Sequence, residues 1–412
     1  MSKVEYKNTL IKDIGRVVTG KTPETKKAEF YGNGYMFITP AELHDGYNVQ
    51  VSDKYITESG LQSIKSNCID GTSVMVGCIG WDMGNVAICH RKCATNQQIN
   101  SITDFNPKYN PFYTYYWLLT KKDYLFTIAS VTRTPILSKS TFEEIVIPMP
   151  DRSIQDNVVG ILKPIDDMIE NNKGICSELE AMAKTLYDYW FVQFDFPDEN
   201  GKPYRTSGGE MVWNEQLKWK IPKEWKVGNL YSVADFINGL ACQKFRPKDG
   251  EQTLPVIKIK EMHDGITAET EQVSENIPSK HKIFDGDILF SWSATLEVIY
   301  WYGGSGGLNQ HIFKVNPKSY FPKEYVYEQL SSYIVNFVKM AEARKTTMGH
   351  ITTDHLEQSK IPLPPEFLIK QFKEKVYPIH LKIGQTKQEN RELTKLRDWL
   401  LPMLMNGQAR VE

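Results

Sequence analysis

Hydrophobic side chains recur at steps of three and four along two segments of the chain, which predicts two long helices. The first repeat runs through Val158, Ile161, Ile165, Met168, Asn172, Ile175, Leu179, Met182, Leu186 and Tyr189. The second runs through Leu368, Phe372, Val376, Ile379, Ile383, Thr386, Asn390, Leu393, Leu396 and Leu400. This spacing keeps side chains on one stripe of a helix, so these positions are expected to pack the helices against each other or against another subunit. Pro164 and Pro378 interrupt the two segments, and we expect a kink or a restart at each.

The chain before each helical segment has a different pattern, in which short apolar runs alternate with Gly, Pro, Asn and Asp. Such runs are typical of short strands and turns. They occur at residues 35–38, 73–78 and 86–88 and again at 255–259 and 287–290. One aromatic-rich helix is expected in each region, at residues 112–119 and 325–338. The prediction is an α+β fold with two mixed α/β domains and two long helices.

The two helical segments carry opposite net charges. Residues 151–190 hold eight acidic and four basic side chains, a net charge of −4. Residues 365–404 hold eight basic and five acidic side chains, a net charge of +3. Opposite charge favours pairing between the two segments over self-pairing, while the apolar seam provides the stability, so we expect an intramolecular antiparallel pair. Asn172 and Asn390 interrupt the seams and either set the register or are tolerated near a wet end.

The whole plan occurs twice in the chain. Residues 42–46 (ELHDG) return as residues 261–265 (EMHDG), and residues 96–99 (NQQI) return as residues 309–312 (NQHI). Residues 147–150 (IPMP) return as residues 361–364 (IPLP). Because the matches keep their order, we interpret the chain as a tandem duplication. The repeated Glu and His of the first motif fit a structural turn better than an acid–base pair.

Composition narrows the class of protein. The chain has 412 residues, of which 41% are hydrophobic and 24% charged, typical of two or three folded domains. It has no apolar run long enough to span a membrane, no secretory signal at its start, and six cysteines without a CxxC pair, which together indicate a cytoplasmic protein with reduced thiols. Its 49 basic and 50 acidic residues nearly cancel, which argues against a freestanding, strongly basic nucleic-acid binder.

One motif could indicate an enzyme. Residues 15–22 (GRVVTGKT) match the GxxxxGK[ST] pattern of a phosphate-binding P-loop, with Lys21 and Thr22 as nucleotide ligands. A P-loop needs a buried strand before it and a helix after it, whereas here polar residues precede the motif and Pro23 follows it. A P-loop NTPase is therefore the alternative function, and a protein-interaction scaffold without a DNA role is the third. We find no complete catalytic set and no metal site, since residues 89–93 (CHRKC) lack a second pair of ligands.

Taken together, these features resemble the specificity (S) subunit of type I restriction–modification enzymes. The resemblance covers nearly the whole chain. It rests on the alternation of variable region and helix, on IPMP and IPLP before the helices, on residues 94–97 (ATNQ), on residues 400–407 (LLPMLMNG) and on the junction from Trp190 to residues 221–225 (IPKEW). It implies a first target-recognition domain at residues 1–150, a central spacer helix at 151–190, a junction at 191–220, a second recognition domain at 221–364, and a C-terminal spacer helix and tail at 365–412.

The resemblance also implies a function. In that family each recognition domain reads one half of a bipartite, asymmetric DNA target, and the helices set the spacing and dock methyltransferase subunits, which in turn hold the restriction subunits. The chain would then be non-catalytic, with double-stranded DNA and those subunits as partners, and S-adenosylmethionine, ATP and Mg would be bound by the partner subunits. As a helix, residues 165–190 would span about 39 Å, or about 11 base pairs.

The candidates for contacting DNA are exposed cations and two tryptophans on loops, because base edges and phosphates are contacted by such groups. In the first half they are Lys21, Lys26, Lys27, Trp81, Arg91, Lys92, Arg133 and Lys139. In the second half they are Lys244, Arg246, Lys248, Lys280, Lys282, Trp292, Arg344 and Lys345. The loops of Arg133 and Arg344 stand at matching positions before IPMP and IPLP and rank first. Trp81 and Trp292, interpreted as matching residues after a strand, rank second.

Overall fold

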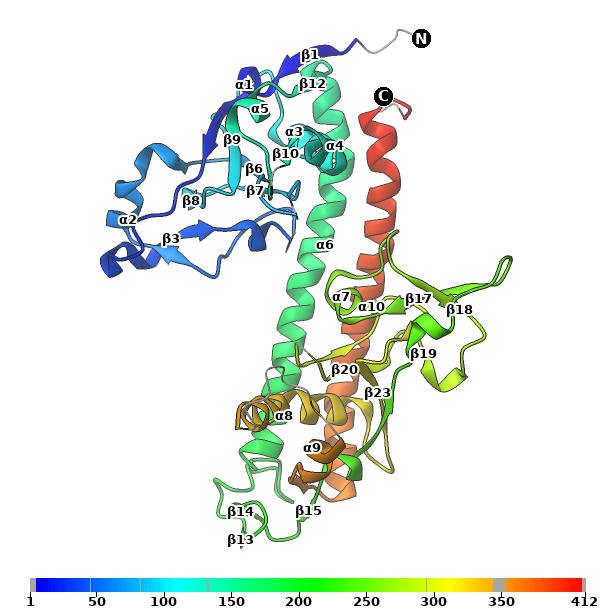
Figure 1. Cartoon of the computed structure of the whole chain (residues 1–412). Coiled ribbons are helices and arrows are strands. Elements are labelled where there is room, and N and C mark those ends of the chain that lie inside the picture. The colour runs from blue at the N-terminus through cyan, green and yellow to red at the C-terminus, as the bar shows by residue number, and fades with distance from the viewer. Residues whose placement is uncertain are drawn as a thin grey trace. The chain divides into compact units, whose positions relative to one another are not determined.

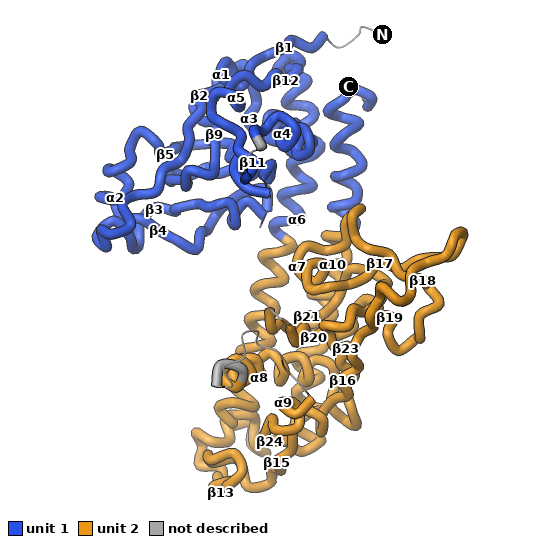
Figure 2. The backbone as a smooth tube through the Cα atoms, in the orientation of Figure 1, with its two compact units in different colours: residues 1–171, 392–412 blue, residues 172–391 orange. Residues whose placement is uncertain are grey.

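The computed structural model describes residues 5–44, 46–81, 83–131, 133–293, 295–343, 351 and 353–409. It divides into two compact units, coloured separately in Figure 2: unit 1 comprises residues 1–171 and 392–412, and unit 2 comprises residues 172–391. Each unit contains one of the two repeated regions together with part of each long helix.

The two long helices are α6 (Arg152–Tyr187) and α10 (Glu366–Met405), close to the predicted spans (Figure 1). A short π-helical turn, Asp188–Val192, follows α6. Both helices continue through Pro164 and Pro378, so the predicted restart does not occur. Each proline removes one backbone hydrogen bond, but buried neighbours such as Leu162 and Ile165 hold the helix on both sides of Pro164.

Unit 1 is built on two four-stranded sheets. The first has the order β2 (Arg16–Thr19), β9 (Ile99–Thr103), β6 (Ser73–Gly77), β7 (Val86–Cys89) and is antiparallel. The second has the order β4 (Tyr55–Ile56), β3 (Tyr31–Ile38), β8 (Cys93–Thr95), β5 (Cys68–Ile69), with β3 and β8 parallel. Two ribbons, β1 (Lys7–Leu10) with β12 (Val146–Met149) and β10 (Ser130–Val131) with β11 (Pro135–Ile136), complete the strands. The helices are α1 (Ile11–Ile14), α2 (Glu58–Ser63), α3 (Pro111–Leu119), α4 (Lys122–Ile128) and α5 (Lys139–Glu143).

The aromatic helix α3 joins the first sheet of unit 1 to α6. Tyr113 and Tyr116 of α3 are fully buried in the core, where they lie with Val74 and Ile102 of the sheet. The Tyr116 hydroxyl donates to Asp166 of α6 at 2.7 Å, and the Tyr47 hydroxyl donates to Asp167. Two phenols therefore attach the repeated region to consecutive carboxylates of the long helix.

Unit 2 repeats this plan. Its antiparallel sheet has the order β16 (Ala234–Asn238), β23 (Ile312–Pro317), β20 (Ile288–Ser291), β21 (Glu297–Tyr300). Its second sheet has the order β18 (Gln272–Ser274), β17 (Thr253–Ile257), β22 (Gly306–Leu308), β19 (Lys282–Ile283), again with the two middle strands parallel. The ribbon β15 (Lys226–Gly228) with β24 (Ile361–Leu363) and the helices α7 (Ile259–Asp264), α8 (Lys323–Ala343) and α9 (Thr353–Gln358) complete the repeat.

Matching strand order and a matching parallel pair confirm the tandem duplication. They also confirm the predicted α+β class. Unit 2 has one addition, the hairpin of β13 (Met211–Asn214) and β14 (Trp219–Pro222), which has no counterpart among the described strands of unit 1.

The long helices pack together in antiparallel order, as predicted. In unit 1, Arg397 donates to Asp166 at 3.0 Å. In unit 2, Asn172 donates to Asn390 at 2.9 Å, and Lys387 pairs with Glu180 at 2.7 Å. Residue numbers on α10 therefore fall as those on α6 rise.

The predicted seam of α6 is wrong at alternate positions. Ile165 and Asn172 are buried, but Met168 and Met182 are 47% and 56% exposed and Ile175 is also exposed. The positions that follow them, Ile169, Cys176 and Ala183, are buried instead. The Cys176 thiol faces the Ile383 carbonyl of α10. Cys176 therefore makes the helix contact that the hydrophobic pattern assigns to the larger Ile175. Of the other predicted packing residues, Ile383 is buried, whereas Ile161, Leu179, Leu186, Ile379, Leu393 and Leu400 are half-buried.

The two seam asparagines contact each other, which supports a role in register. Asn172 is 8% exposed, and its amide donates both to Asn390 and to Glu389. Replacing Asn172 with leucine should lower the free energy of unfolding by about 1 kcal/mol, because the half-buried Asn390 loses the hydrogen bond that Asn172 donates. Urea unfolding measures this loss, and the same change at the exposed neighbour Asn171 is the control. Equal effects at both positions would contradict the role of the pair.

A buried acid and a buried imidazole meet between α8 and α10 in unit 2. Glu328 and His380 are each about 5% exposed, with 3.8 Å between Oε1 and Nε2. Burial raises the pKa of Glu328 to about 8, although Lys184 opposes this shift, and burial lowers the pKa of His380 to about 4. Tyr300 packs on the imidazole with ring centroids 5.1 Å apart. At neutral pH the pair therefore consists of a carboxylic acid and a neutral imidazole.

Unit 2 should lose stability as the pH rises from about 6.5 to 8. In this window the folded state retains a proton on Glu328 that the unfolded state releases, whereas His380 has already lost its proton in both states. The expected loss is about 1–2 kcal/mol, and Glu328→Gln should abolish it. Thermal unfolding against pH tests this, with Glu374→Gln, an exposed acid of α10, as the control. An unchanged pH dependence in Glu328→Gln would contradict the assignment.

Candidate nucleic-acid interface

Strand direction brings several candidate residues to one edge of the antiparallel sheet of unit 1. Thr19, the last residue of β2, pairs with Asn100 near the start of β9, and Gly77, the last residue of β6, pairs with Ile99. The loop after β2, the loop before β9 and the loop after β6 therefore leave the sheet at the same edge. These loops carry Lys21, Gln97 and Trp81.

Hydrogen bonds connect these loops. The Lys21 amide donates to Thr95 O at 2.9 Å, and the Thr22 hydroxyl donates to Gln97 Oε1 at 2.8 Å. The Gly80 amide donates to Pro135 O at 3.0 Å, which places the β10–β11 ribbon, with Arg133 between its strands, beside the loop of Trp81. We call Lys21, Trp81, Gln97 and Arg133 the loop edge of unit 1.

The loop edge of unit 1 combines exposed cations with an exposed aromatic ring. Trp81 is 70% exposed, and its ring contacts Phe126 with centroids 5.9 Å apart. Lys21 and Arg133 are exposed, and neither has an ion-pair partner among the described residues. Unpaired cations beside an amide and an aromatic side chain can contact phosphates and base edges.

Other candidates of unit 1 lie elsewhere. Arg91 and Lys92 follow β7, whose last residue pairs with the first residue of β6, so they leave the sheet at the opposite edge. Lys139 begins α5, which packs on β2, and pairs with Glu143 at 3.5 Å. Lys26 and Lys27 lie farther along the loop after β2, where Lys27 pairs with Glu24 at 3.2 Å.

Unit 2 has an equivalent edge with different side chains. The Trp292 indole, after β20, donates to Asn238 Oδ1 at the end of β16 at 3.2 Å, and its ring contacts His311 with centroids 5.5 Å apart. Lys244, Arg246 and Lys248 are exposed on the loop after β16. Lys280 is exposed and Lys282 is half-buried, whereas Arg344 and Lys345 lie outside the described residues.

The interpretation of Trp81 and Trp292 as equivalent residues is wrong. The Trp292 amide donates to His311 O, and its carbonyl accepts from the Ile351 amide at 2.9 Å. In unit 1 the residue with the same two bonds is Cys78, which donates to Gln98 O and accepts from Leu137 at 2.8 Å. Trp292 thus occupies the position after the strand and is half-buried, whereas Trp81 stands farther out on a longer loop.

Residues 15–22 do not form a P-loop. Residues 16–19 are strand β2, and the amides of Gly20 and Lys21 donate to the carbonyls of Ile99 and Thr95, so they cannot cradle a phosphate. A Cβ at Gly20 would lie 2.1 Å from Asn96 O, and one at Gly239 would lie 2.0 Å from Asn309 O. Both glycines allow the chain to pass close to the repeated Asn, which explains why the motif keeps its glycine in unit 2.

The other motifs are structural. Glu42 caps a short turn by accepting from the Thr39 amide, and Glu261 does the same with the Lys258 amide, as expected for a repeated turn. Cys89 and Cys93 are buried free thiols with 3.7 Å between their sulfurs, and the described residues contain no cluster suited to a metal ion. No helix in the described part of the chain is long and apolar enough to cross a membrane.

Gln97 and its counterpart Gln310 were not among the predicted site residues. They lie in the repeated NQQI and NQHI motifs, in the loops before β9 and β23. The repetition itself was the available signal. Repetition alone, however, does not distinguish a residue that builds the loop, as Asn96 and Asn309 do, from an exposed one such as Gln97.

Comparison with known proteins agrees with this architecture. The family model described as "type I restriction modification DNA specificity domain" matches residues 3–181 and 222–371. The chain is 26% identical to the type I restriction enzyme MjaIX specificity subunit of Methanocaldococcus jannaschii, over 98% of this chain and 93% of that protein. It is 25% identical to the HindI specificity subunit of Haemophilus influenzae, over 69% of this chain and 74% of that protein. The crystal structure of a type I restriction–modification S subunit from M. genitalium matches with a TM-score of 0.55 and 14% identity, over 98% of this chain and 97% of that one.

Proposed function

This chain belongs to the family of type I restriction–modification DNA specificity subunits, and from that premise we propose how its two units divide the task. It is the non-catalytic subunit that selects the DNA target of the complex. We propose that unit 1 reads one half of a bipartite target through its loop edge and that unit 2 reads the other half through the equivalent edge.

The observation that carries this proposal is the repeated loop edge with changed side chains. Both edges arise from the same strand order, yet one presents Trp81 and Arg133 and the other presents Trp292, Asn238 and His311. Equivalent backbones with different reading groups are suited to two half-sites of different sequence. The target should therefore be asymmetric.

The long helices would set the distance between half-sites and dock the methyltransferase subunits. Exposed apolar side chains support a docking role, since Ile175 and Met182 lie seven residues apart on the solvent side of α6 in unit 2. Restriction subunits would join through the methyltransferases, and the complex would act in the cytoplasm. S-adenosylmethionine, ATP and Mg would be held by those partners.

The near-zero net charge leads to a further expectation. Outside residues 151–190 and 365–404 the formal charge is also zero, so the chain alone should bind DNA weakly and lose this binding quickly with added salt. Much of the positive surface would then come from the partner subunits.

Methylation mapping tests the proposal directly. The host genome is mapped with the chain present and with it deleted, and we expect a bipartite asymmetric motif to lose its methylation in the deletion strain. Gel shifts of the chain with its methyltransferase partner, on a library of random sequences, should select the same motif. A complex that binds all sequences equally would contradict the proposed function.

A further inference from the structure

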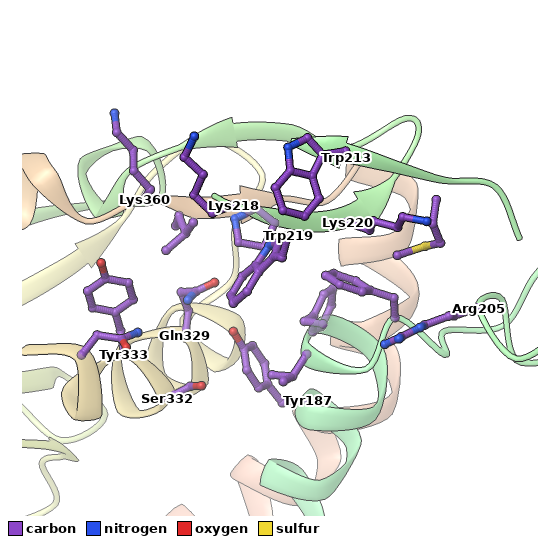
Figure 3. Close-up of a pocket in the computed structure, with 17 residues that line it drawn as sticks. Tyr187, Arg205, Trp213, Lys218, Trp219, Lys220, Gln329, Ser332, Tyr333 and Lys360 are labelled. Carbon is purple, nitrogen blue, oxygen red and sulfur yellow. The ribbon is translucent and has the colours of Figure 1, made fainter. Parts of the chain in front are cut away.

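Unit 2 contains a cavity of about 590 Å³ beside the β13–β14 hairpin (Figure 3). The end of α6 contributes Tyr187 to its wall, α8 contributes Gln329 and Tyr333, and β14 contributes Trp219. Figure 3 shows Trp219 in the middle of this group, above Tyr187 and Gln329. The β13–β14 hairpin forms part of the cavity wall. The described strands of unit 1 include no equivalent hairpin.

The hairpin presents aromatic surface to solvent. Trp213 and Trp219 are 55% and 51% exposed, and the Trp213 indole already donates to Glu215 at 2.9 Å. A two-stranded ribbon is only marginally stable by itself. Exposed rings add little to its stability, so two large ones side by side indicate a binding surface. Tryptophan, tyrosine and arginine are the residues that dominate binding energy at protein interfaces.

The rim of the cavity is positively charged. Four of its lining residues are basic, namely Arg205, Lys218, Lys220 and Lys360, and no lining residue is acidic. Lys218 pairs with Glu215 at 3.0 Å, whereas the other three have no ion-pair partner among the described residues. Figure 3 shows Lys218 and Lys360 extending away from the aromatic wall. An occupant that places an apolar group inside and carboxylates outside would satisfy both parts of the site.

We propose that this cavity binds an acidic segment of the methyltransferase subunit, with a large apolar or aromatic side chain beside Trp219 and its flanking carboxylates on Lys220, Lys360 and Arg205. This inference rests on the proposed function. Because the duplicated helices would offer two equivalent docking surfaces and the described strands of unit 1 include no hairpin like β13–β14, the site serves one of two bound methyltransferase copies.

A protein segment fits this site better than DNA does. The walls are mainly apolar and aromatic. Two lysines in or beside the hairpin are already paired, Lys218 with Glu215 and Lys223 with Glu210. These pairs leave few free cations for a phosphate backbone, whereas phosphate-binding surfaces are polar and strongly basic. An apolar anchor flanked by a few carboxylates needs only the apolar wall and the cations of Arg205, Lys220 and Lys360.

The test measures how many methyltransferase subunits the full chain binds without DNA. Native mass spectrometry should give two copies for the wild type, and Trp219→Ala/Lys220→Glu should weaken binding of one copy at least about tenfold while leaving the other unchanged. Lys220→Glu/Lys360→Glu keeps the aromatic wall and should have the same effect, which guards against a folding defect in the first variant. The control is Tyr124→Ala/Lys65→Glu, an exposed aromatic and an exposed cation of unit 1.

The outcomes separate this inference from the function on which it rests. If the wild type binds two copies and both cavity variants bind them equally well, the cavity assignment is wrong and the proposed function stands. If the variants keep both copies but lose DNA affinity, the occupant is nucleic acid and the inference is overturned. A wild-type chain that binds no methyltransferase overturns both.

Discussion

Replacing Arg397 with methionine should lower the free energy of unfolding of unit 1 by about 3–5 kcal/mol. The Arg397 guanidinium donates to Asp166 at 3.0 Å, and Asp166 is only 2% exposed. Burial, reinforced by the Asp166 carboxylate, raises the pKa of Tyr116 above its ordinary value, so the phenol remains a neutral donor to Asp166. Without the guanidinium, the buried carboxylate would retain only this neutral side-chain donor among the described residues, which does not compensate for its lost hydration. Urea unfolding followed by circular dichroism measures the loss.

Two further variants isolate the buried pair. Lys395→Met removes an exposed ion pair with Glu392 on the same helix and should cost less than about 1 kcal/mol. Asp166→Asn combined with Arg397→Met removes both charges and should recover part of the stability lost in the single variant. If Arg397→Met behaves like Lys395→Met, the ion pair does not stabilise the packing of α10 on α6 in unit 1.

Reversing the charge of Lys21 and Arg133 together should lower the affinity of the assembled complex for its target by about 100-fold or more. Both side chains are exposed on the loop edge of unit 1 and have no ion-pair partner among the described residues. Two lost phosphate contacts should also reduce the slope of log affinity against log salt by about 2. Fluorescence anisotropy titrations at several salt concentrations measure both quantities.

The opposite edge of the same sheet provides the matched control. Lys92→Glu with Lys139→Glu makes the same change of net charge. Lys92 follows the end of β7, and Lys139 begins α5, which packs on β2. This control should change affinity by less than about threefold, through the general field of the protein alone. Equal losses from the two double variants would contradict the assignment of the loop edge. Methylation mapping should further show weaker methylation of an unchanged motif, because lost phosphate contacts do not alter which bases are read.

Local pattern was sufficient for the elements but not for their contacts. The aromatic helices were predicted at residues 112–119 and 325–338 and are found as α3 and α8. The seam of α6 was predicted with Met168 and Met182, whereas Ile169 and Ala183 are buried. A repeat with steps of three and four does not decide whether Met168 or Ile169, or Met182 or Ala183, faces the partner helix. The packing of α10 against α6 decides this.

The candidate site shows the same division. Residue type and loop position identified Lys21, Trp81 and Arg133, with the loop of Arg133 ranked first and Trp81 second, but they also identified Arg91 and Lys139. Strand direction separates these groups, because antiparallel register sends the ends of β2 and β6 to one edge and the end of β7 to the other. Register depends on pairing between segments far apart in the chain, which single-residue properties do not contain.

By itself the sequence determined the duplication, the two long helices and their opposite charge, because these are properties of composition and spacing along the chain. The tertiary structure decided the rest. It showed that Gly20 packs against Asn96 rather than against a phosphate, that Trp292 corresponds to Cys78 rather than to Trp81, and that the junction hairpin encloses a cavity in unit 2. Each of these depends on which distant backbone segments lie within hydrogen-bond or van der Waals distance, and that proximity exists only once the sheets and helices have packed.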